Sequence, residues 1–101
     1  MSSPLIVQLD MAQFCEATDL PAVYVIEIVE HGILEPQGAQ PREWRFTDYE
    51  LSLAKRAAKL RRELELEWDG VALALNLLEE VHELRAENRM LRQRLGRLVV
   101  E

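Results

Sequence analysis

The sequence predicts a mainly α-helical protein: a small winged helix-turn-helix unit followed by one long C-terminal helix that forms a coiled coil. Three observations predict this fold. Two short helical segments meet at a tight turn near the N-terminus, a loop rich in Pro and Gly separates two β-prone segments after them, and the last third of the chain repeats apolar residues at heptad spacing. The 101 residues fit one structural unit, which we divide into residues 1–67 and a dimerisation helix at 68–101.

The helix-turn-helix is expected between residues 10 and 32. Asp10 can cap a short helix whose apolar residues recur three and four positions apart. Pro21 suits the first turn of a second helix, which we expect to end at about His31. Gly32 suits the C-terminal cap of that helix.

A hairpin comparable to the wing of a winged helix is predicted next. Ile33–Glu35 and Glu43–Phe46 are β-prone, and the loop between them contains Pro36, Gly38 and Pro41. The apolar run at residues 5–9 predicts a short strand or an extended entry into the fold.

A third helix follows the wing. Thr47 and Glu50 have the spacing of a capping box, which marks its start. Its basic run at 55–62 is most simply a solvated face balanced by neighbouring Glu residues. Asp69-Gly70 interrupts the helical pattern, and Asp69 can cap a last helix from about Val71.

The last helix has the strongest periodicity of the chain. From Ala74 onward, apolar residues alternate at spacings of three and four, which is the a/d pattern of a coiled coil. Asn88 occupies an a position, where a buried amide fixes register and oligomeric state. We therefore expect a homodimer, with parallel and antiparallel pairs both open, rather than a helix packed on its own domain. The predicted dimerisation residues are Leu77, Val81, Leu84, Asn88, Leu91, Leu95 and Leu98.

The net charge of −6 lies entirely on the first 41 residues. They contain six acidic residues and no Lys or Arg, whereas residues 42–101 contain twelve of each sign. Binding to DNA depends on Lys and Arg that neutralise phosphates, so this acidic half is not expected to bind nucleic acid directly. The same field attracts a basic protein surface.

The second helix is the expected site of that contact. Val23, Glu27 and Glu30 share one helix edge, which gives an apolar contact flanked by carboxylates. The helix offers no Arg to guanine and no Asn to adenine, the usual donors of base recognition. The predicted partner-binding residues are Glu16, Asp19, Val23, Glu27, Glu30 and Glu35.

Catalysis is not expected. His31 and His82 stand apart from any ligand set with metal spacing, and Cys15 lies on an apolar helix face. The sequence predicts no cofactor and no metal. It also contains neither a secretory signal nor an apolar run long enough for a membrane span, so we expect a cytoplasmic protein.

Two stretches place the fold among known families. "MAQFCEATDLPAVYVIEIVEHGILEP" and "WRFTDYEL", followed by the long helix, resemble the MerR family of transcription regulators. That resemblance implies a winged helix-turn-helix and a coiled-coil dimer. Where members that bind DNA carry Arg in the second helix, this chain reads "YVIEIVEHG".

A closer resemblance covers nearly the whole chain. "LRRELELEWDGVALALNLL" and "ENRMLRQRL" are similar to the CbpM family of chaperone modulators. The family implies a protein that binds the J-domain of the DnaJ-like co-chaperone CbpA. It would inhibit the work of CbpA with the Hsp70 chaperone DnaK and its binding to DNA.

Two other functions stay open. One is a MerR-like DNA-binding transcriptional regulator that uses Arg42, Arg45 and the Lys55–Arg62 face. The other is a dimeric adaptor whose specific surface is the coiled coil alone.

Overall fold

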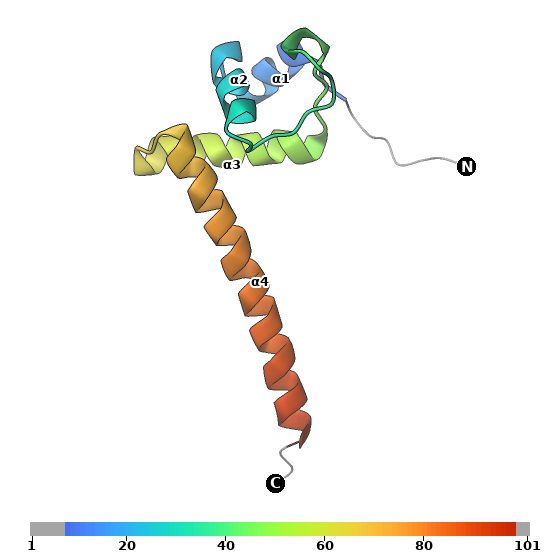
Figure 1. Cartoon of the computed structure of the whole chain (residues 1–101), viewed down its shortest axis with the longest axis vertical. Coiled ribbons are helices and arrows are strands. Elements are labelled where there is room, and N and C mark those ends of the chain that lie inside the picture. The colour runs from blue at the N-terminus through green and yellow to red at the C-terminus, as the bar shows by residue number, and fades with distance from the viewer. Residues whose placement is uncertain (1–7, 99–101) are drawn as a thin grey trace, which may run out of the picture.

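The structure is a computed structural model that describes residues 8–98. Its helices are α1 (Met11–Thr18), α2 (Ala22–Glu30), α3 (Asp48–Leu64) and α4 (Trp68–Leu98), with a short 3₁₀ helix, η1 (Pro41–Glu43), in the loop before α3. Figure 1 shows α1 and α2 seated on one side of α3, while α4 leaves the corner after α3 and extends away from the other helices. The mainly helical fold with a long terminal helix confirms the predicted class.

Local capping signals set the starts of α1 and α3. The Asp10 carboxylate accepts a hydrogen bond from the Gln13 backbone, and the Gln13 side chain accepts one from the Asp10 backbone. Thr47 and Glu50 make the same reciprocal pair at the start of α3. The sequence predicted the Asp10 cap and the Thr47–Glu50 capping box, whereas the return bond from Gln13 is a finding of the structure. Both caps satisfy backbone N–H groups that have no partner within the helix.

The α2 helix also matches its prediction within one residue at each end. Pro21 precedes it as the N-cap, and His31 is its C-cap. Gly32 follows with a φ of 76°, and its N–H donates to the Val29 carbonyl at 3.0 Å. A left-handed residue just past a helix is where glycine is favoured.

The core lies where α1, α2, the wing and the first turns of α4 meet α3. The Phe14 and Phe46 rings stack at 4.0 Å, and Trp44 meets Phe46 edge-on at 6.2 Å. The buried apolar residues of α3 are small, Ala54 and Ala57. The buried apolar residues are Phe14, Val25, Ile28, Leu34, Trp44, Phe46, Ala54, Ala57, Trp68 and Val71.

The wing is smaller than predicted. Within residues 8–98 the pairing consists of single antiparallel bridges: Gln37 with Arg45 inside the wing, and Leu9 with Phe46 between the N-terminal segment and the wing. The prediction that Ile33–Glu35 forms one arm is wrong, because the chain pairs only from Gln37 and Leu34 turns into the core. Of the strand expected at 5–9, Leu9 is paired, and residues 5–7 lie outside the described part.

The boundary before α4 also differs from the prediction. The helix begins at Trp68, so Asp69 and Gly70 lie inside its first turn instead of interrupting it. The break comes earlier, at Glu65, which adopts a left-handed φ of 53° and donates its N–H to the Arg61 carbonyl. Glycine is not required at position 70, because a Cβ there would make only ordinary contacts with Leu66, at 3.5 Å.

Candidate partner-binding surface

The outer edge of α2 is open to solvent. Its inner face is fixed by Val25 and Ile28, which are fully buried against the core. On the outer edge Val23 is 57% exposed and Glu30 is exposed, while Glu27 between them is half-buried. The structure therefore brings these three predicted residues together along one edge, at the spacing the sequence indicated.

Glu27 has a structural partner that the sequence did not reveal. The Trp68 indole N–H donates to Glu27 Oε1 at 2.9 Å, which joins α2 to the first turn of α4. The Tyr24 ring meets the Trp68 ring edge-on at 5.8 Å, and the Arg61 guanidinium lies 5.0 Å from the centroid of each. The predicted contact residue is thus also part of a packed cluster at the α3–α4 corner.

The remaining predicted partner residues occupy three places. Glu16 is exposed on α1, and Asp19 is exposed at its end with a left-handed φ of 60°. Glu35 is exposed beside the start of α3, where it lines a shallow hollow with Thr47 and Tyr49. Glu35 therefore belongs to a different part of the surface from the α2 edge.

The basic residues considered for nucleic acid lie on two elements, the wing and α3. Arg42 and Arg45 are exposed on the wing, and the Arg45 guanidinium donates to the Trp44 carbonyl at 2.9 Å. On α3 the exposed basic residues are Lys55, Arg56, Lys59 and Arg62. Arg61 differs from these because it is half-buried against two aromatic rings.

The apolar stripe of α4 lies open. Every side chain from Asn76 through Arg97 is exposed. Leu84 is 58% and Leu95 is 61% exposed, and Leu77, Val81 and Leu91 are exposed at the same spacing. Asn88 is also exposed, and its Oδ1 accepts a hydrogen bond from Arg92 Nε at 2.8 Å. Leu98 ends the helix, and its side chain lies outside the described part.

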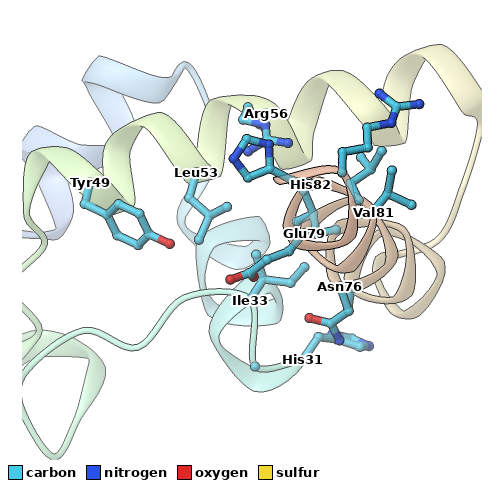
Figure 2. A pocket seen from close by; sticks show the side chains of 14 residues that line it. His31, Ile33, Tyr49, Leu53, Arg56, Asn76, Glu79, Val81 and His82 are labelled. Atoms are coloured by element: carbon cyan, nitrogen blue, oxygen red, sulfur yellow. The ribbon is translucent and has the colours of Figure 1, made fainter. Parts of the chain in front are cut away.

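A groove of about 660 Å³ runs between α3, α4 and the segment after α2. Figure 2 shows its lining, with Tyr49 and Leu53 from α3, Ile33 from the segment after α2, and Val81 and His82 from α4. Sequence reasoning missed this groove, because it depends on the angle at which α4 leaves α3. Of the predicted site residues, Val81 lines it.

The environment of Cys15 and the hydropathy of the helices were also of interest in the sequence. Burial raises the pKa of the Cys15 thiol above its ordinary value of 9.0, which disfavours the reactive thiolate. Among residues 8–98, no helix is long and apolar enough to span a membrane.

Comparison with known proteins defines the class first. Residues 9–93 match the family of MerR HTH regulatory proteins, so the chain is a MerR-type helix-turn-helix protein with a long terminal helix. Within that class it belongs to the family of chaperone modulatory proteins named CbpM.

Relatives of that name match almost end to end. The CbpM proteins of Pseudomonas putida (strain W619) and Pseudomonas entomophila (strain L48) are 66% and 65% identical to it, and each alignment covers 96% of both chains. The CbpM protein of Escherichia coli (strain HS) is 42% identical, with 88% of both chains covered. These relatives are named as modulators of chaperones rather than as enzymes.

Proposed function

We propose that the protein binds the J-domain of the DnaJ-like co-chaperone CbpA and inhibits its co-chaperone activity toward Hsp70 and its binding to DNA. The observation that carries the proposal is the acidic outer edge of α2. This helix is the second of the helix-turn-helix, and it presents Val23, Glu27 and Glu30 with no Lys or Arg. The name of the close relatives, chaperone modulatory protein, supports the same function.

Electrostatics explains the choice of partner. J-domains present a basic helix to Hsp70, and an acidic edge attracts that helix, whereas it repels phosphates. A modulator seated on the basic helix excludes Hsp70 from it. Glu16 on α1 and Asp19 at its end are further exposed carboxylates that we assign to the same contact.

The proposal includes a homodimer formed through α4. In a monomer the leucines of its a/d stripe are exposed to water. Burying apolar surface stabilises a protein by about 25 cal/mol for each Å² removed from water. Pairing two copies along this stripe removes that surface from solvent.

The test is the ATPase of Hsp70 stimulated by the CbpA J-domain, with increasing amounts of this protein. Wild type should suppress the stimulation. The double variant Glu16→Lys, Glu30→Lys should suppress it much less, because it reverses charge at two exposed positions. Glu27 is left intact in this variant, since its bond to Trp68 makes its replacement a structural change as well.

The matched control is Glu79→Lys, Glu83→Lys, which makes the same change of charge on exposed positions of α4. It should inhibit as wild type does. If the control loses inhibition and the Glu16→Lys, Glu30→Lys variant keeps it, the contact lies at the groove beside α4 and not on the acidic residues of α1 and α2. If wild type never suppresses the stimulation, the proposed function is wrong.

A DNA-binding regulator is the second candidate. It is favoured by the MerR family match and by the exposed basic residues of α3 and the wing. A gel-shift titration over a range of salt concentrations separates the two functions, because phosphate contacts give a steep salt dependence. Tight, steeply salt-dependent binding of this chain alone to DNA would favour the regulator.

A further inference from the structure

Four side chains from three helices meet at the corner where α3 turns into α4. Tyr24 and Glu27 come from α2, Arg61 from α3 and Trp68 from α4. Trp68 is only 4% exposed and donates its indole N–H to Glu27 Oε1 at 2.9 Å. A buried tryptophan thus contacts a carboxylate of the partner-binding edge, and the proposed function does not account for this contact.

The Trp68 ring is itself held firmly. The Arg61 guanidinium is 5.0 Å from the centroids of the Trp68 and Tyr24 rings, within the range of cation–π attraction. Arg61 Nε is buried without a hydrogen-bond acceptor in the described part of the chain, and the guanidinium contacts both rings. The indole N–H is therefore presented to Glu27 Oε1 from a ring that is packed on Arg61 and Tyr24.

The bond orders the Glu27 carboxylate without neutralising it. An indole N–H is an uncharged donor, and a carboxylate offers two oxygens with about four acceptor sites. With Oε1 engaged by the indole, Oε2 remains able to accept from a cation on a binding partner. A Lys or Arg in the place of Trp68 would have cancelled the charge that attracts such a cation.

We propose that Trp68 is a positioning residue for the partner-binding edge: it holds Glu27 ready to receive a cationic side chain of a basic partner, beside Val23 and Glu30. This inference rests on the proposed function. Its physical basis is preorganisation, because a glutamate that is already ordered loses less conformational entropy when the partner binds.

The first test observes the indole directly in the wild-type full-length chain. The ¹⁵N-labelled protein has two tryptophan Nε1–H signals, and the variant Trp44→Phe assigns them. On titration with the basic J-domain, the Trp68 signal should shift as Glu27 takes up a second donor, while the Trp44 signal stays in place. Binding measured by calorimetry with an unmoved Trp68 signal overturns the inference and leaves the proposed function standing.

The second test removes the N–H. Trp68→Phe should weaken J-domain binding about threefold to tenfold, the factor expected for losing the order of one long side chain. Replacement of Trp68 by benzothienylalanine in the Trp44→Phe background should do the same, because that residue keeps the shape of indole without its donor. Trp44→Phe alone should bind as wild type, which controls for a general loss of stability.

A double-mutant cycle separates positioning from folding. In the Glu27→Ala background, Trp68→Phe should change the affinity by less than about twofold, since the carboxylate it positions is gone. An equal loss in both backgrounds overturns the inference, as does wild-type affinity in the benzothienylalanine variant. Absence of binding by wild type overturns the inference and the proposed function together.

Discussion

At the scale of single residues, the backbone of the wing requires glycine at position 38. Its φ is 118°, in the region that side chains avoid, and a Cβ there would lie 2.6 Å from the carbonyl oxygen of Glu43. Gly32 also has a positive φ, 76°, but a Cβ there would meet open space. A side chain at either position would therefore adopt a strained φ, and only a side chain at position 38 would also clash with the backbone.

These glycines give a matched pair of variants. Gly32→Ala should lower the free energy of unfolding by about 1–2 kcal/mol, the strain of a left-handed alanine. Gly38→Ala should lower it further, by at least about 1 kcal/mol more, because the loop must also shift. Chemical denaturation of both variants measures the difference, and equal losses would contradict the backbone clash.

Cys15 gives a prediction about pH. Burial raises the pKa of its thiol, so the folded state holds the thiol proton more tightly than the unfolded state. The stabilisation is complete below the unfolded pKa and is lost as pH rises through the folded pKa, so this group lowers stability only in alkaline solution. Alkylation by iodoacetamide at mildly alkaline pH should accordingly be slower in the folded protein than in urea. Equal rates would show an accessible, ordinary thiol.

At the scale of helices, short-range signals were predictable and long-range ones were not. Asp10 with Gln13 and Thr47 with Glu50 are three residues apart, so the sequence alone shows that they can cap. The bond between Glu27 and Trp68 joins residues far apart in the chain, and it depends on the corner after α3. The prediction of a solvated basic face fails at Arg61, because one of its aromatic partners, Tyr24, is far away in the sequence and the other, Trp68, lies beyond the corner after α3.

The start of α4 illustrates a second limit. Asp69-Gly70 has the composition of a turn, yet both residues are helical. The packing of Trp68 and Val71 into the core decides the outcome, because burying two large apolar residues outweighs the cost of one helical glycine, about 1 kcal/mol. Tertiary contacts of this kind override local propensity and cannot be read from neighbouring residues.

The cap of α3 supplies the prediction at this scale. Thr47→Ala removes the side chain that accepts from the Glu50 N–H and should lower the free energy of unfolding by about 1 kcal/mol. Ser52→Ala, on the exposed face of the same helix, should change it by less than about 0.5 kcal/mol. Thermal unfolding of the two variants compares them directly. A Thr47→Ala protein as stable as Ser52→Ala would mean that the cap contributes nothing.

At the scale of the whole molecule, the shape is more extended than that of a compact domain. The radius of gyration is 18.2 Å, whereas a compact domain of 100 residues has about 13 Å. The excess comes from α4, which projects away from the other helices (Figure 1). The leucines of its a/d stripe are exposed. The heptad pattern predicted this helix from the sequence, and pairing with a second copy stays a prediction.

A matched pair of charge insertions tests the pairing. Leu84→Glu places a carboxylate in the a/d stripe and should yield a monomer at concentrations where wild type is a dimer, because a buried charge without a partner is strongly unfavourable. Ala86→Glu makes the same addition outside the stripe and should leave the dimer intact. Sedimentation equilibrium gives both masses. A wild-type monomer, or a Leu84→Glu dimer, would contradict pairing along this face.

A single titration can test whether the acidic edge of α2 recognises a basic J-domain. The full-length protein is titrated with the purified CbpA J-domain by calorimetry at low and at moderate salt. We expect binding at low salt that weakens clearly at moderate salt, because screening reduces attraction between exposed charges. Binding that ignores salt would keep the partner and reject the acidic edge, and no binding at either salt would contradict the claim outright.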